Sequence, residues 1–278
     1  MHAARGLVRL VHPFPIVLDG LATAAVVLLA GGDGTVALRL GAAMTALQAS
    51  IGALNDLVDA RLDLGRKPGK PIPAGQVSPT IARFVLIGAA GAGFALTVPS
   101  GPGLMAIAGL GLAVGYAYDL VAKGTAWSWV PFAIGLPLLP VFAWFGARGS
   151  LSPAFGMLLP AAVAAGAALA LANARADLER DQSGGVASVA TRLGARRAWW
   201  LGAALMAGVA LLALSSLVLA GSPVQALGAA VLAVVLLGAG VVIGKGASAD
   251  RRERGWEIQA VAVAALAAAW LWGIGIAS

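Results

Sequence analysis

The sequence contains no cysteine, only two histidines and few charged residues. Without cysteine, the 278-residue chain cannot form disulfides, use a thiol nucleophile or bind a metal through thiolates. His2 and His12 both lie near the N-terminus, which argues against a metal site built from histidines. Charged residues make up 11% of the chain and hydrophobic residues 60%, whereas soluble domains average about 25% and about 45–50%. So few charges cannot solvate the surface of so apolar a globule, and a water-soluble enzyme is excluded.

What the chain does have is a series of long apolar segments, separated by polar or Gly/Pro-rich breaks, and its mean hydropathy is +0.89. A bilayer core needs about 20 apolar residues per helix, and nine segments approach this length. The sequence therefore predicts an all-α, polytopic membrane protein with nine transmembrane helices in a single domain, residues 1–278. The predicted spans are Phe14–Gly31, Val36–Leu54, Thr80–Val98, Gly103–Leu120, Trp127–Phe145, Pro153–Ala172, Ala198–Ala220, Val224–Gly244 and Trp256–Ile276.

The distribution of lysine and arginine predicts how the chain is oriented. The formal net charge is +7. With nine alternating spans, all 19 basic residues except Arg39 and Arg148 fall on the side of the N-terminus. Cytoplasmic loops of membrane proteins carry an excess of such residues, so we expect a cytoplasmic N-terminus in a bacterial or archaeal cell membrane. The same rule accounts for the positive net charge. We therefore expect membrane lipids as partners and no nucleic acid. The oligomeric state stays open at this stage.

A cluster of carboxylates ends the second predicted span. It begins at Asn55 and contains Asp56, Asp59 and Asp63. If the helix continues through it, the three aspartates fall at i, i+3 and i+7 and share one face. Like charges placed in this way repel one another, so the pattern does not serve helix stability.

A second carboxylate cluster occupies the equivalent place at the end of the sixth span. Asn173, Asp177 and Asp181 recur at i, i+4 and i+8, which predicts one helical stripe. Each cluster leads into a basic, glycine-containing loop, residues 65–75 in the first case and 184–192 in the second. Both clusters therefore face the side of the membrane on which the basic residues gather, and we expect the active site there.

Oxygen ligands without histidine or cysteine suit Mg²⁺, which is held by one or two carboxylates together with substrate phosphates. Basic loops next to such carboxylates match a metal-bridged diphosphate, whose oxygens arginine and lysine can neutralise. The alternative is that the carboxylates only cap helix ends in ordinary interfacial loops. The recurrence of the cluster at two equivalent places favours the metal interpretation. If both clusters hold one diphosphate, they must face a common cavity.

Five motifs in order along the chain resemble the UbiA superfamily of intramembrane prenyltransferases. They are Asn55-Asp56-x-x-Asp59-x-x-x-Asp63, Lys70-Pro71-Ile72-Pro73-Ala74-Gly75, Tyr116-x-Tyr118-Asp119-Leu120-x-x-Lys123, Asp177-x-x-x-Asp181 and Arg192-Leu193-Gly194. The resemblance implies nine helices around a central cavity. It also implies Mg²⁺-dependent transfer of a prenyl group from a polyprenyl diphosphate to a lipophilic, typically aromatic, acceptor. Two departures stand out: Asn173 replaces a carboxylate found in many members, and Lys67 and Lys70 occupy positions where arginine is common.

The resemblance also implies a role for each site residue. Metal ligands would be Asn55, Asp59 and Asp63 for one Mg²⁺ ion and Asp177 and Asp181 for a second, with Asp56 close by as a further catalytic residue. Substrate would be bound by Asn55, Arg66, Lys67, Lys70, Lys123 and Asn173. Tyr116 and Tyr118 are the only tyrosines; they would stabilise an allylic cation through their ring faces, although interfacial anchoring is the alternative.

One carboxylate, Asp19, lies inside the first predicted span, where exposure to lipid costs roughly 2.5–3.5 kcal/mol. It is either a cavity-facing residue that contacts the acceptor or a neutral, hydrogen-bonded side chain.

Three other functions compete with prenyl transfer. A terpene cyclase would also form an allylic cation by releasing diphosphate from its substrate. A transporter would be expected to place charge at the membrane midplane. A CDP-alcohol phosphotransferase would need a DGxxAR run, which neither Asp19-Gly20 nor the two clusters continue.

Overall fold

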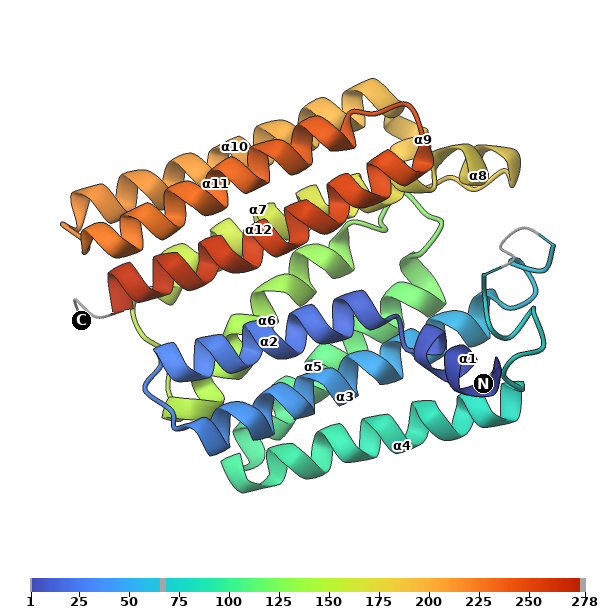
Figure 1. Cartoon of the computed structure of the whole chain (residues 1–278), viewed down its shortest axis with the longest axis horizontal. Coiled ribbons are helices and arrows are strands. Elements are labelled where there is room, and N and C mark those ends of the chain that lie inside the picture. Colours follow the sequence, from blue (N-terminus) through green and yellow to red (C-terminus); the bar gives the residue numbers. More distant parts are fainter. Residues whose placement is uncertain (1, 66–68, 276–278) are drawn as a thin grey trace. The chain divides into compact units, whose positions relative to one another are not determined.

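A computed structural model describes residues 2–65 and 69–275, and within these ranges the protein is built of helices without strands (Figure 1). All nine predicted spans are helical, which confirms the all-α prediction. The long helices are α2 (Pro13–Leu29), α3 (Gly34–Asp59), α4 (Pro79–Thr97), α5 (Pro102–Ala117), α6 (Val130–Arg148), α7 (Phe155–Ala176), α10 (Ala195–Leu219), α11 (Val224–Gly244) and α12 (Ala249–Gly275). Short elements join them: α1 (His2–Leu10), the 3₁₀ turn η1 (Val98–Ser100), the π-helical turn η2 (Tyr118–Ala122), α8 (Leu178–Ser183) and α9 (Val189–Leu193).

Eight of these helices, some extended by an adjoining turn, are long and apolar enough to cross a membrane. A ninth span results if α1 and α2, which meet at a bend of 61°, are counted together. The bend lies at His12, whose φ of 56° places a non-glycine residue in the left-handed region. The helix α2 therefore counts as a span only together with α1, and the chain bends sharply at His12 between the two helices.

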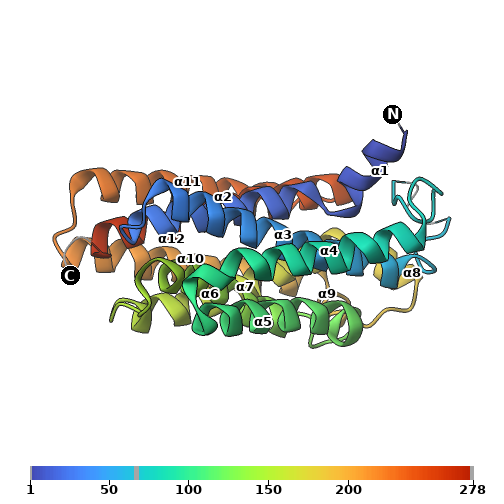
Figure 2. The same ribbon diagram turned by 90° about the horizontal axis from the view of Figure 1, so that it is seen from below.

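The chain forms two compact units, and the first comprises residues 1–121 and 139–150. In it, α3 packs against both α2 and α4, and α2, α3 and α4 run side by side in Figure 1 and Figure 2. At the C-terminal end of α3, a small core joins Leu10 of α1, Ala53 of α3, Val77 of the following loop and Ala82 of α4. This core fixes α1 and the loop around residues 69–77 beside the first carboxylate cluster.

The second unit comprises residues 122–138 and 151–278. Here α7 packs against α10 and α12, and α11 packs against α12. A buried cluster of Leu171, Leu178, Val189, Ala190 and Ala198 joins the end of α7 to α8, α9 and the start of α10. The second carboxylate cluster lies where α7 ends and α8 begins.

The helices α11 and α12 approach each other closely at Gly244 and Gly255. A Cβ atom on Gly255 would lie 2.4 Å from the backbone N and Cα of Gly244. We expect Gly255→Ala to lower the melting temperature clearly, because backbone atoms cannot move aside and overpacking costs about 1–3 kcal/mol or more. Gly228→Ala on α11 is the matched control, since a Cβ there meets nothing within 4 Å. Equal melting temperatures for the two variants would contradict this account.

Candidate active site

The first carboxylate cluster forms the C-terminal end of α3. The helix ends at Asp59, and the N–H of Asp63 donates to the Asp59 carbonyl (2.9 Å), which adds one more turn. The side chains of this cluster are almost inaccessible: Asp56 is 1% exposed, Asp59 7% and Asp63 6%. Burying three carboxylates is costly unless cations or hydrogen bonds compensate them. These three carboxylates therefore need cations or hydrogen-bond donors close by.

Lys70 and His12 provide compensation at Asp56. The Lys70 ammonium forms an ion pair with Asp56 Oδ1, and His12 Nε2 lies 2.9 Å from the same oxygen. Lys70 Nζ is also 3.4 Å from Asn55 Oδ1. The other carboxylate oxygen of Asp56 is buried and accepts no hydrogen bond from any residue that the structure describes. His12 was not among the predicted site residues; its position in the polar break between two apolar segments was the available signal.

Lys70 is the part of the first basic loop that the structure places in the site. The loop backbone is held by Arg9 of α1, whose Nη1 donates to the Gly69 carbonyl at 3.5 Å. The predicted diphosphate ligands Arg66 and Lys67 lie outside the described residues. The structure thus links α1, the loop and α3 around one buried carboxylate.

The tyrosine-containing motif brings another carboxylate to the first cluster. At the end of α5, the hydroxyls of Tyr116 and Ser50 are hydrogen-bonded at 2.7 Å. Tyr118 opens the π-helical turn η2, which carries Asp119, a side chain that is 5% exposed. Asn55 Nδ2 donates to Asp119 Oδ1 at 2.6 Å. Asp119 was quoted in the motif but not selected as a site residue, because sequence spacing does not reveal a partner 64 positions away.

The second carboxylate cluster differs from its prediction. Asn173, Asp177 and Asp181 were expected on one helical stripe, but α7 ends at Ala176 and Asp177 connects it to α8. The Asp181 N–H still donates to the Asp177 carbonyl (2.9 Å), so a helical turn spans the junction. All three side chains are half-buried, and Arg180 Nη1 lies 2.7 Å from Asp177 Oδ1. Lys123, in the turn after η2, is also half-buried and belongs to the second unit.

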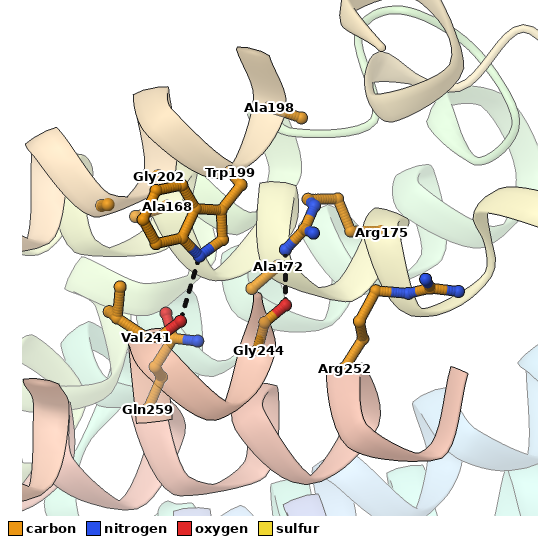
Figure 3. Close-up of a pocket in the computed structure, with 11 residues that line it drawn as sticks. Ala168, Ala172, Arg175, Ala198, Trp199, Gly202, Val241, Gly244, Arg252 and Gln259 are labelled. Atoms are coloured by element: carbon orange, nitrogen blue, oxygen red, sulfur yellow. Dashed lines mark hydrogen bonds between the residues drawn. The ribbon is translucent and has the colours of Figure 1, made fainter. Parts of the chain in front are cut away.

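Two buried arginines, Arg175 and Arg252, hold the helices around the second cluster together. Arg175 on α7 donates from Nη1 to the Gly244 carbonyl (2.7 Å) and from Nε to the Ala195 carbonyl (3.1 Å), which ties α7 to α10 and α11. Arg252 on α12 forms an ion pair with Glu179, which lies midway between Asp177 and Asp181 in the sequence. Both arginines line a small cavity with Trp199 and Gln259 (Figure 3). Its volume, about 20 Å³, is large enough for one water molecule.

The Glu179–Arg252 pair should keep α8 in place. Arg252 is 5% exposed, whereas the Glu179 side chain is 62% exposed. A hydrogen bond to a charged group contributes about 1.5–3 kcal/mol, so we expect Glu179→Ala to speed amide exchange in residues 178–183 at least about 10-fold. Hydrogen–deuterium exchange measures this directly. Glu253→Ala, an exposed glutamate of α12, is the control; equal exchange in both variants would show that the pair does not hold α8.

Asp19 has a partner within the first unit. Gln48 Nε2 on α3 donates to Asp19 Oδ2 on α2 at 2.7 Å, and both side chains are half-buried. The structure thus realises the hydrogen-bonded alternative for Asp19.

The donor set of the clusters fits Mg²⁺ in its chemistry. Among the described residues, no three His, Cys, Asp or Glu side chains converge as a complete metal site would. Mg²⁺ does not require such a site, because it usually keeps several waters and takes phosphate oxygens as ligands. The oxygens of Asn55, Asp59 and Asp63 therefore suit an ion that binds together with a diphosphate.

Comparison with known proteins gives consistent results. The profile of the UbiA prenyltransferase family matches residues 20–260. A digeranylgeranylglyceryl phosphate synthase of Methanoregula boonei is 30% identical over 200 residues, 69% of this chain and 70% of its own length. A protein of the same name from Methanopyrus kandleri is 31% identical over 122 residues, 44% of this chain and 45% of its own. The match thus spans less than half of the Methanopyrus protein.

Solved structures share the fold. A structure of digeranylgeranylglyceryl phosphate synthase has a TM-score of 0.70 and 16% identity, and the alignment covers 98% of this chain and 99% of the other. A UbiA homologue from Archaeoglobus fulgidus, solved with DMAPP and Mg²⁺, has a TM-score of 0.67 and 17% identity, with 94% and 98% covered. At these identities the likeness establishes the helical fold and nothing finer.

Proposed function

The chain belongs to the UbiA prenyltransferase family, and from this premise we propose that it transfers a prenyl group from a prenyl diphosphate to a lipid-soluble acceptor within the membrane. The bond between the allylic carbon and the diphosphate oxygen breaks, and the acceptor oxygen or carbon takes the allylic carbon and releases a proton. The barrier to this step is the charge that accumulates on the departing diphosphate. The observation that carries the proposal is the buried, oxygen-rich cluster at the end of α3.

Bound Mg²⁺ would neutralise charge on the diphosphate oxygens. Asn55, Asp59 and Asp63 are proposed to hold one ion, and Asp177 and Asp181 are proposed to hold a second. Lys70 is proposed to bind a diphosphate oxygen, and its ion pair with Asp56, which holds the ammonium beside Asn55, supports this role. Asp56 thus positions Lys70, and Lys123, Asn173, Arg66 and Lys67 are proposed as further diphosphate contacts.

Tyr116 is proposed to border the allylic cation. Its hydroxyl is hydrogen-bonded to Ser50, which restrains the position of the side chain, and a tyrosine ring can stabilise positive charge through its face. Tyr118 begins the turn η2, and residues two apart along a helix point in different directions, so Tyr118 is the alternative candidate for this contact.

For the acceptor, we propose an isoprenoid glyceryl phosphate. Two relatives are named digeranylgeranylglyceryl phosphate synthases, and the product in that name is a glyceryl phosphate with two geranylgeranyl chains. An aromatic acceptor, which the sequence analysis expected, is the alternative. In either case the site is proposed to lie on the cytoplasmic side, and the excess of basic residues in the loops beside it supports this.

One assay tests the proposal. The purified chain in lipid nanodiscs is incubated with prenyl diphosphates of several lengths, with and without Mg²⁺, and with geranylgeranylglyceryl phosphate or a hydroxybenzoic acid as acceptor. Pyrophosphate release and product mass are then measured. We expect release that requires both Mg²⁺ and the glyceryl phosphate. Release without acceptor, accompanied by a cyclic hydrocarbon, would identify a cyclase, and binding without release would indicate a transporter.

A further inference from the structure

The hydrogen bond between Asn55 and Asp119 determines which end of the Asn55 amide faces the first carboxylate cluster. A side-chain amide carries an acceptor oxygen and a donor NH₂ group, and it can exchange them by turning over. An ionised carboxylate only accepts hydrogen bonds. Since Asp119 Oδ1 lies 2.6 Å from the Asn55 amide, the atom facing it must be the nitrogen.

With the nitrogen fixed, the oxygen of Asn55 points to the other side. There it lies 3.4 Å from the Lys70 ammonium, which also pairs with Asp56. The Asn55 oxygen therefore faces the side on which the cluster holds positive charge. If the amide turned over, its oxygen would meet the Asp119 carboxylate and its NH₂ group would meet the ammonium, and both contacts are unfavourable.

The backbone at Asp119 brings this carboxylate into reach. Asp119 lies in the single π-helical turn Tyr118–Ala122 that follows α5, and its side chain is buried. A π-turn redirects side chains relative to an uninterrupted α-helix, and such turns are frequent at functional sites. The turn therefore places a charged group against a neutral amide, an arrangement with no evident benefit to packing.

We propose that Asp119 is a positioning residue, which orients the Asn55 amide so that its oxygen is presented to the metal–diphosphate complex. The charge of Asp119 also polarises the amide and increases the negative charge on that oxygen. Hydrogen-bond partners of metal ligands act in this way, and their loss typically weakens metal binding about 10–100-fold. This inference rests on the proposed function, in which Asn55 is a Mg²⁺ ligand.

The test is a titration with Mn²⁺, followed by electron paramagnetic resonance, on the full chain in nanodiscs with pyrophosphate present. We expect Asp119→Leu to weaken Mn²⁺ binding about 10–100-fold, and Asp119→Asn to weaken it less, because the new amide can still accept from Asn55 but lacks the charge. The exchange Asn55→Asp/Asp119→Asn restores both the hydrogen bond and the charge count, so its affinity should return to within about 3-fold of wild type. Thr97→Val, which removes a buried hydroxyl donating to the Phe94 carbonyl on α4, should bind Mn²⁺ like wild type.

The melting temperature without metal separates orientation from a purely structural role. If Asp119→Leu and Asp119→Asn melt earlier but bind Mn²⁺ normally, Asp119 is structural and the inference is wrong. If Asn55→Ala and Asp59→Asn also bind Mn²⁺ normally, the proposed ligand set itself is wrong. If Asp119→Leu does not fold, the exchange variant decides, since weak binding by a folded exchange variant would contradict the proposed orientation.

Discussion

Replacing Asp59 with Asn is expected to reduce prenyl transfer about 10²–10³-fold, the usual effect of removing one group that stabilises a developing charge. Asp59 is buried at the last residue of α3. The substitution preserves the shape of the side chain and removes the charge that would hold a metal. Because a buried carboxylate is itself costly, we expect the variant to fold and to melt at or above the wild-type temperature. Steady-state pyrophosphate release measures the expected loss of activity, and the melting temperature measures the expected stability.

Asp181→Asn should produce a loss of similar size from the second unit. Asp181 is half-buried on α8, so its neutralisation should leave stability almost unchanged. If both clusters hold the same diphosphate, the double variant should lose much less than the product of the two single losses, because residues that act as a unit are not additive. Multiplicative losses would indicate two independent roles.

Asp33→Asn is the matched control for both variants. Asp33 caps the opposite end of α3, where its side chain accepts from the N–H groups of Thr35 (2.8 Å) and Val36 (2.9 Å). Asparagine caps helices about as well as aspartate, so activity and stability should both be retained. A rate above about a tenth of wild type in Asp59→Asn or Asp181→Asn would mean that the carboxylate in question does not hold the metal.

The helices could be predicted from sequence because their signal is local. A bilayer demands long apolar stretches whatever their tertiary neighbours, so segments such as Thr80–Val98 coincide with α4 to within a residue or two. The i, i+3, i+7 spacing of Asp56, Asp59 and Asp63 was informative for the same reason. The break between α7 and α8 was missed, since neither glycine nor proline marks the junction at Asp177.

The contacts that complete the site could not be predicted, because they join residues far apart in the chain. His12 and Asp119 contact residues of the first cluster, and Arg252 contacts Glu179 beside the second, across 44 to 73 positions. Spacing within a motif carries no information on such partners. Composition offered one hint: a buried carboxylate in a chain with few charges needs a compensating group somewhere, but packing alone decides which residue supplies it.

Lys70→Met is expected to destabilise the first unit and to impair transfer. Lys70 is 16% exposed and pairs with Asp56, which is 1% exposed. Removing one partner of a buried ion pair leaves an uncompensated charge, at a cost of about 3–5 kcal/mol. Because Lys70 is partly accessible to water and His12 remains beside Asp56, we expect a loss near the lower end of that range. The melting temperature and the resistance to SDS denaturation measure it.

Neutralising Asp56 in the same chain should separate the two roles of Lys70. In Lys70→Met/Asp56→Asn no charge is left unpaired between these positions, so most of the lost stability should return. The ammonium that is proposed to bind the diphosphate is still missing, so prenyl transfer should stay low and the KM for prenyl diphosphate should stay high. Lys245→Met, an exposed lysine whose ammonium lies 5.1 Å from the Trp199 ring centroid, is the control and should cost no more than about 1 kcal/mol. Full recovery of transfer in the double variant would show that Lys70 serves only to neutralise Asp56, and diphosphate binding would then have to be assigned to other cations of the loop.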